Sequence, residues 1–185
     1  MKAQTVRLFF ALWPDDEVRN QLVKVSRNIQ LSKHGRSMRK ANLHMTLHFI
    51  GNTDVENAKC LQQVANKVIA QPFSLKIDKA GQFKHPGIVW LGCSAVPAGL
   101  HRLHHELGEV ISSCDFEPEK RHYRPHVSLY RKAALDETAS EISSIEWQVD
   151  SFSLISSQQD RQGVIYRELQ RYPLNQTLPS ATDTA

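Results

Sequence analysis

A short alternating pattern occurs twice in this chain and restricts how the chain can fold. His44-Met45-Thr46-Leu47 and His126-Val127-Ser128-Leu129 both have the form His-x-hydroxyl-Leu. Residues at i and i+2 of a β-strand point to the same face, so each copy predicts an imidazole beside a hydroxyl, with the apolar residues facing a core. Two such strands brought face to face would offer two imidazoles and two hydroxyls to one ligand, which suits acid–base chemistry on a phosphate.

The alternation continues around both copies. In the first strand it predicts an apolar face formed by Leu43, Met45, Leu47 and Phe49. The opposite, polar face is formed by Asn42, His44, Thr46 and His48. We expect His48 to be a polar neighbour at the strand end. Pro125 marks the start of the second strand, where a missing backbone N–H is tolerated.

Strands and helices are intermixed along the rest of the chain. One helix is expected to begin with the acidic turn Asp15–Glu17, a second to cover about 54–70, and a third to begin near Pro97. Further strands are expected at 6–12, 73–83, 88–95, 148–156 and 164–171, the last two as a hairpin around 161–163. This mixture, with mostly antiparallel connections, places the chain in the α+β class.

Length and composition are those of one globular domain. We expect residues 1–176 to form a single domain and the small polar residues 177–185 to form a disordered tail. The net charge of +4 and the sequence pI near 9.0 fit an anionic partner. No stretch is long enough to span a membrane. Cys60, Cys93 and Cys114 contain no C-x-x-C pair, so we expect reduced thiols and a cytoplasmic protein, with neither a disulfide framework nor a zinc knuckle.

Four segments resemble those of the two-histidine (2H) phosphoesterases, namely Val6–Leu12, Asn42–Leu47, Ile88–Gly92 and Arg124–Leu129. Within that superfamily the chain is most similar to bacterial RNA 2′,3′-cyclic phosphodiesterases, the 2′-5′ RNA ligase family, from about Val6 to Pro173. The resemblance implies a two-lobed, pseudo-symmetric fold. Each lobe would be an antiparallel sheet with helices on its outer face, and the active-site cleft would lie between the lobes.

The resemblance also implies a reaction and the residues that perform it. His44 would be the proton donor and His126 the proton acceptor, and Thr46 and Ser128 would donate hydrogen bonds to the phosphate oxygens. The implied substrates are RNA ends or cyclic nucleotides bearing a 2′,3′-cyclic phosphate, and the implied product is a 2′-phosphate, with no metal and no cofactor. ATP-independent 2′-5′ joining of RNA would be a side or reverse activity. No protein partner is implied, and we expect a monomer.

Three residues next to the second motif are candidates for substrate binding. Arg131 matches a basic position common in this family, but strict alternation places it opposite His126 unless a bulge intervenes. Tyr123 and Arg124 precede the motif and could stack on a base.

Two other functions remain open at this stage. One is an RNA-binding module on the same fold without catalysis, which the presence of both histidines and both hydroxyls disfavours. The other is a metal-dependent phosphodiesterase that uses His101, His104 and His105, although these histidines fall outside the apolar stripe of their helix and are expected to be solvated. No Gly-x-x-x-x-Gly-Lys-[Ser/Thr] loop for a nucleoside triphosphate is present.

Overall fold

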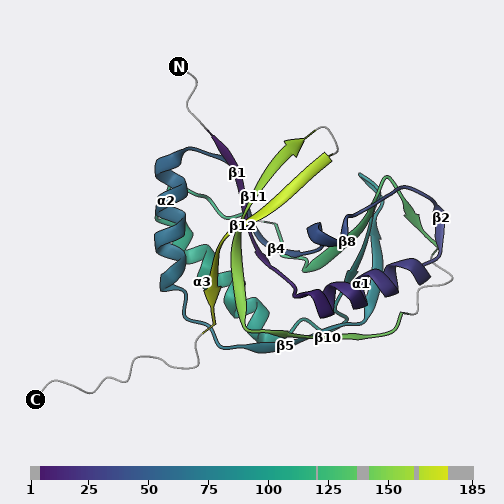
Figure 1. Ribbon diagram of the computed structural model, residues 1–185. Coiled ribbons are helices and arrows are strands. Elements are labelled where there is room, and N and C mark those ends of the chain that lie inside the picture. Colours follow the sequence, from purple (N-terminus) through teal and green to yellow (C-terminus); the bar gives the residue numbers. More distant parts are fainter. Residues whose placement is uncertain (1–4, 120, 137–141, 161–162, 175–185) are drawn as a thin grey trace, which may run out of the picture.

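The protein has an α+β fold with one large antiparallel sheet and three α-helices (Figure 1). The computed structural model describes residues 5–119, 121–136, 142–160 and 163–174. The helices are α1 (Asp16–Asn28), α2 (Val55–Val64) and α3 (Ala98–Ser112), with short 3-10 helices at Lys40–Asn42 and Ala65–Lys67. The strands are β1 (Val6–Leu12), β2 (Leu31–Lys33), β3 (Arg36–Ser37), β4 (Met45–Thr53), β5 (Phe73–Ile77), β6 (Lys79–Phe83), β7 (Ile88–Gly92), β8 (His126–Arg131), β9 (Ala134–Leu135), β10 (Ile145–Val149), β11 (Ser151–Asp160) and β12 (Gly163–Pro173).

The two motif strands are neighbours in a single sheet. The eight-stranded sheet has the order β12-β11-β1-β4-β8-β7-β6, and β3 pairs with β8. β4 and β8 run antiparallel and pair through Met45 and Val127, the middle residues of the two motifs. The expectation of a separate sheet in each lobe is therefore wrong, because hydrogen bonds between β4 and β8 join both halves. In this register position 44 lies opposite position 128, and position 46 lies opposite position 126.

A bulge in β4 changes the predicted faces of the first strand. Phe10 pairs with His48 and Ala11 pairs with Thr46, so Leu47 is an extra residue on β4. One inserted residue reverses the alternation that follows it. His48 is consequently buried and Phe49 is 52% exposed, the reverse of the predicted arrangement.

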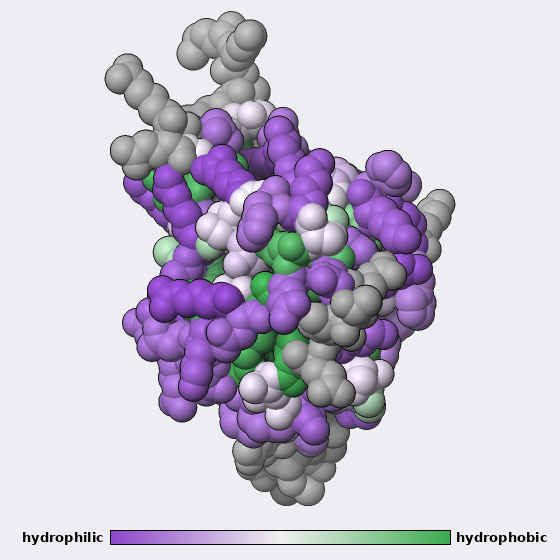
Figure 2. Space-filling view, turned by 90° about the vertical axis from the view of Figure 1, so that its right-hand side faces the viewer, coloured by the Kyte–Doolittle hydropathy of each residue, from purple (hydrophilic) through white to green (hydrophobic). Residues whose placement is uncertain are grey.

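Helices α2 and α3 pack against the part of the sheet that contains β1 and β4, and both lie on the left of Figure 1. Asp15 caps α1 by accepting a hydrogen bond of 2.8 Å from the Val18 amide, and Val18, Leu22 and Val25 form its buried face. The interior is built mainly from aliphatic side chains of the sheet and helices. The face seen in Figure 2 is mostly hydrophilic, with apolar residues showing near its middle.

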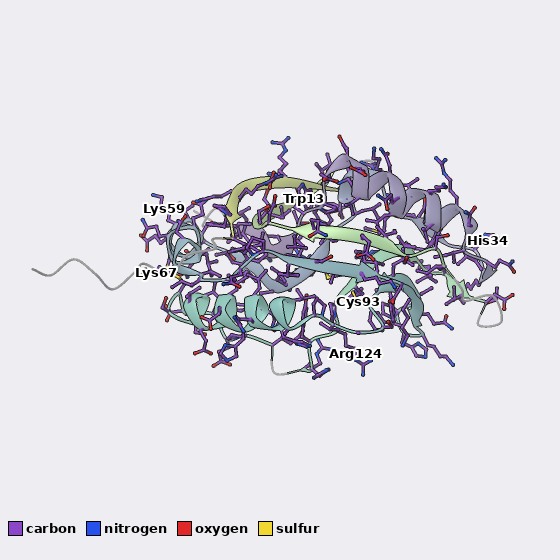
Figure 3. All side chains as sticks on the ribbon, turned by 90° about the horizontal axis from the view of Figure 1, so that it is seen from below. Trp13, His34, Lys59, Lys67, Cys93 and Arg124 are labelled. Atoms are coloured by element: carbon purple, nitrogen blue, oxygen red, sulfur yellow. A yellow bond between two sulfur atoms is a disulfide. The ribbon has the colours of Figure 1, made fainter. Side chains whose placement is uncertain are left out.

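Further predicted features differ from the structure. The strand expected at 148–156 is divided at Asp150 between β10, which pairs with β5, and β11, which pairs with β1 and β12. The strand expected at 73–83 is two strands that belong to different sheets, since β5 pairs with β10 and β6 pairs with β7 on either side of Asp78. The cysteines are not all reduced, because Cys60 and Cys114 form a disulfide between α2 and the end of α3. Cys93 is free and half-buried, in the middle of the view in Figure 3, and burial raises the pKa of its thiol to about 11.

The expected tail at 177–185 and the hairpin tip at 161–162 lie outside the described residues. Among the residues that the structure describes, no helix is both long and apolar enough to cross a membrane.

Candidate active site

A cleft of about 1170 Å³ brings both motifs together. His44, Thr46, His126 and Ser128 all line it, although their strands are neighbours in one sheet and do not lie face to face. Its wall also carries four arginines, namely Arg7, Arg36, Arg39 and Arg131. Among the described residues, no acidic side chain lines it. A cavity with this charge favours an anionic ligand.

The His44 ring is held by the backbone just before it. Its Nδ1 lies 2.7 Å from the carbonyl oxygen of Asn42, and its Nε2 lies 3.1 Å from Oγ1 of Thr46. The buried side chain of Asn42 donates a hydrogen bond of 2.8 Å to the Val164 carbonyl of β12 and so fixes this segment. The ring packs against three aromatic residues, Phe9 at 4.8 Å, Tyr166 at 5.2 Å and Trp13 at 5.9 Å between ring centroids.

The His126 ring is held in the same way. Its Nδ1 lies 2.7 Å from the carbonyl oxygen of Arg124, two residues earlier. A carbonyl only accepts hydrogen bonds, so Nδ1 carries the proton in both imidazoles and Nε2 is left for proton transfer. Phe83 packs edge-on at 4.9 Å and Trp90 lies 6.3 Å away.

Burial lowers the pKa of both imidazoles. The pKa of His44 falls to about 4, mainly through loss of solvent, and the charges of His126 and Arg131 lower it further. The pKa of His126 is also lowered by burial, while its hydrogen bond to the Arg124 carbonyl acts in the opposite direction. Both rings are therefore mainly neutral at pH 7 in the ligand-free protein.

A second bulge directs Arg131 into the cleft. Val89 pairs with Tyr130 and Trp90 pairs with Ser128, so Leu129 is the extra residue on β8. Tyr130 then turns inward and donates a hydrogen bond of 3.0 Å to the Ser26 carbonyl of α1, while Arg131 lines the cleft beside His126 and Ser128. The bulge therefore places Arg131 on the same face as His126, whereas strict alternation would place it on the opposite face.

Tyr123 and Arg124 do not line this cleft. They line a second cavity of about 630 Å³, which shares Thr46, Phe49 and His126 with the first. The Tyr123 hydroxyl donates a hydrogen bond of 3.0 Å to the Thr46 carbonyl, and its ring stacks on His104 at 3.9 Å between centroids. A ring already stacked in this way is a structural support for β4, and the face that contacts His104 is not available for stacking on a base.

The three helix histidines do not act together. His104 is stacked between Tyr123 and His48, and its backbone carbonyl lies 2.8 Å from Nε2 of His48. His101 and His105 are exposed, as expected for solvated residues, but the expectation fails for His104. No group of three or more potential metal-ligating side chains gathers among the described residues.

Sequence reasoning missed several residues that line the cleft. Strict alternation places Phe49 on the buried face, and Phe9, Tyr166 and Arg7 come from strands β1 and β12 that carry no motif. The guanidinium of Arg7 lies 4.9 Å from the centroid of the Phe49 ring. The alternating sequence of β1 could have placed Arg7 and Phe9 on one face, but not beside His44.

Known proteins match both the sequence and the geometry. The model for a family described as the 2′-5′ RNA ligase superfamily matches residues 14–161. The RNA 2′,3′-cyclic phosphodiesterase of Escherichia coli K12 is 31% identical over 172 residues, covering 92% of this chain and 97% of that protein. The chain belongs to the 2′-5′ RNA ligase superfamily.

Other similar proteins agree with the assignment. The RNA 2′,3′-cyclic phosphodiesterase of Aquifex aeolicus is 26% identical over 187 residues, covering 92% of this chain and 98% of that protein. The crystal structure of apo E. coli LigT matches with a TM-score of 0.84 and 30% identity, over 94% of this chain and all of that one. LigT complexed with 3′-AMP matches over the same shares with a TM-score of 0.83 and 31% identity. The chain is thus homologous to RNA 2′,3′-cyclic phosphodiesterases.

Proposed function

We propose that this chain hydrolyses the 2′,3′-cyclic phosphate at RNA ends to a 2′-phosphate by metal-independent acid–base catalysis. The observation that carries the proposal is the cleft itself, in which two imidazoles with the same Nδ1–H tautomer meet two hydroxyls and four arginines. Imidazole suits both proton transfers of this reaction because its pKa lies near neutrality.

In the proposed step, Nε2 of His126 takes a proton from water as the water oxygen attacks phosphorus. The bond between phosphorus and O3′ breaks, and O3′ takes the proton carried by Nε2 of His44, which leaves the phosphate on O2′. Thr46, Ser128 and Arg131 would donate hydrogen bonds to the non-bridging oxygens, where negative charge grows. Because His44 has a pKa of about 4 without ligand, the phosphate anion must raise that pKa before His44 can act as the acid.

We also propose the two-lobed description, in which β12, β11, β1 and β4 form one half and β8, β7 and β6 form the other, with one motif from each. The enzyme would act as a cytoplasmic monomer on RNA. Because Cys60 and Cys114 form a disulfide, the cysteines do not argue for a cytoplasmic location. The cytoplasmic location is proposed on the basis of the RNA substrate.

The decisive experiment uses an oligonucleotide that ends in a 2′,3′-cyclic phosphate, incubated with the purified protein with and without a chelator. We expect a 2′-phosphate product and equal rates in both samples. A predominant 3′-phosphate, or loss of turnover in chelator, would contradict the proposed mechanism. Binding without turnover would favour the alternative of a non-catalytic RNA-binding module.

A further inference from the structure

The second cavity borders only part of the proposed catalytic apparatus. His126 and Thr46 line both cavities, whereas His44, Ser128 and Arg131 line only the main cleft. The proposed base, His126, therefore borders the second cavity directly, whereas the proposed acid, His44, does not. This is the position of an attacking group, because a nucleophile approaches phosphorus from the side opposite the leaving oxygen.

The wall of the second cavity combines rings and positive groups. Phe83, Phe116 and Phe49 contribute rings, and Phe49 is 52% exposed where the two cavities adjoin. Exposed cationic or imidazole side chains line it too, namely Arg121, Arg124, His85 and His122. Rings for base stacking beside positive groups for phosphates are the features with which proteins bind single-stranded nucleic acid.

One acidic residue lies in this wall. Glu119 accepts a hydrogen bond of 2.9 Å from Nε of Arg121 and a second one from its Nη2. Both bonds go to the same carboxylate oxygen, and a guanidinium has five N–H donors, so the pair leaves Arg121 with donors for a phosphate. The exposed position of this pair means that its charges remain accessible to a ligand.

We propose that the second cavity binds the 5′-terminal nucleosides of an acceptor RNA strand, whose 5′-hydroxyl replaces water at His126. The 5′-oxygen would attack phosphorus and give its proton to Nε2 of His126. The bond between phosphorus and O3′ would break, O3′ would take the proton of His44, and a 2′-5′ linkage would form without ATP. This inference rests on the proposed function, since it uses the same base and the same cyclic phosphate.

The test measures binding, so it does not depend on turnover. A trinucleotide with a free 5′-hydroxyl and a fluorophore at its 3′ end is titrated with protein that is saturated with adenosine 2′-phosphate, and anisotropy is recorded. We expect the dissociation constant of the trinucleotide to stay within about threefold of its value without the mononucleotide, because the two ligands occupy different cavities. Displacement of the trinucleotide would overturn the proposal.

Two charge reversals provide a matched pair. Arg121→Glu should weaken trinucleotide binding by about fivefold or more, which corresponds to an exposed ionic contact of about 1 kcal/mol. Lys59, which is exposed on α2 and labelled in Figure 3, does not line the second cavity. Lys59→Glu makes the same change of charge there and should leave trinucleotide binding within about twofold of the wild-type value. Equal weakening in both variants would show a general charge effect and overturn the assignment to this cavity.

Hydrolysis of adenosine 2′,3′-cyclic phosphate separates this inference from the proposed function. This mononucleotide needs only the main cleft, so Arg121→Glu should hydrolyse it at the wild-type rate, which also reports that the variant is folded. If the wild-type protein does not hydrolyse it, the proposed function fails, while the anisotropy titrations still test the second cavity. If Arg121→Glu loses hydrolysis and trinucleotide binding together, the two cavities are not separate sites.

Discussion

His44 and His126 occupy equivalent positions in two copies of one motif, yet the two halves of the site surround them differently. Three aromatic rings enclose His44, and its Nε2 contacts Thr46. His126 packs against Phe83 and Trp90 and borders two cavities. The same local geometry therefore holds one ring in a closed apolar setting and the other at an open junction. Unequal environments are what allow two like groups to take unequal protonation states.

Removing each ring is the strongest way to test this difference. His44→Ala and His126→Ala should each lower kcat on a cyclic phosphate by about 10²–10⁴-fold, the usual loss for a general acid or base. Both side chains line the cleft, so circular dichroism and melting temperature should stay close to those of the wild type. Near-normal turnover in either folded variant would remove that residue from the mechanism.

A change of leaving group should then separate the two roles. A phosphodiester with a p-nitrophenolate leaving group does not need protonation, so His44→Ala should lose about tenfold or less on it, while His126→Ala should still lose about 10²-fold or more. The opposite pattern would exchange the assignments of donor and acceptor. This comparison matters because the lower pKa of His44 in the ligand-free protein would by itself favour the exchanged roles.

The two hydroxyls should differ in a second way. Thr46→Val and Ser128→Ala should each lower kcat by about 10²-fold if each hydroxyl stabilises the growing charge. Only Thr46 has its hydroxyl at 3.1 Å from Nε2 of the neighbouring histidine, where it donates to the neutral ring. Thr46→Val should therefore raise the pKa of His44, as read from the imidazole proton shifts by NMR. An unchanged His44 titration would show that this contact does not tune the ring.

The bulges explain where sequence reasoning worked and where it stopped. The pairing of His44 with Thr46 and of His126 with Ser128 follows from period-two alternation, which holds up to the bulged residues Leu47 and Leu129. Beyond Leu47 the alternation fails, so Phe49 faces the cleft and His48 the interior. A bulge depends on the hydrogen bonds of the partner strand, which a single strand's sequence does not reveal.

Contacts between distant segments were equally hidden. Cys60 and Cys114 meet only because α2 and α3 pack together, and at a sequence separation of 54 nothing in the local pattern indicates that contact. The α+β class and most element positions could be predicted, since they depend on local patterns. The single continuous sheet could not, because its central pair of Met45 and Val127 forms only when the halves fold together.

Substitutions at the two residues whose carbonyls hold the rings should also differ in their effects. Asn42→Ala removes the buried hydrogen bond to the Val164 carbonyl and should lower kcat by about tenfold, because small displacements of a catalytic group are costly. The free energy of unfolding should fall by about 1–3 kcal/mol. Arg124, at the equivalent place before His126, has an exposed side chain, so Arg124→Ala should have a smaller effect on both quantities. Equal losses would mean that exposed contacts also hold His126.

The pH dependence should reflect the lowered pKa values of the two partly buried rings. One imidazole must be protonated and the other neutral, so kcat/KM should follow a bell whose limbs belong to the coupled pair. Burial lowers both pKa values below the ordinary 6.5, that of His44 to about 4. The rate should fall below the lower value as the base becomes protonated, and above the upper value as the acid loses its proton. We expect the optimum of kcat/KM to lie between these values.

The optimum of kcat should lie at higher pH than that of kcat/KM, because the bound phosphate anion raises the pKa of both rings. A cyclic mononucleotide is a suitable substrate, since its phosphodiester stays a monoanion over this range. A rate that rises steadily to alkaline pH would instead indicate hydroxide as the nucleophile and would remove the need for a paired acid and base.

The disulfide should change stability with the smallest effect on turnover. Cys60 and Cys114 connect α2 and α3, which pack behind β1 and β4 in the His44 half, and neither lines the cleft. Closing a loop of 54 residues should stabilise the fold by about 4 kcal/mol, since the cross-link restricts the unfolded chain. Reduction should lower the denaturant midpoint while kcat changes by less than about twofold, and Cys60→Ala/Cys114→Ala should behave the same with or without reductant. A large loss of kcat in reduced, folded protein would mean that the helices behind β4 position His44. The two halves would then differ in how the catalytic ring is held as well as in its solvation.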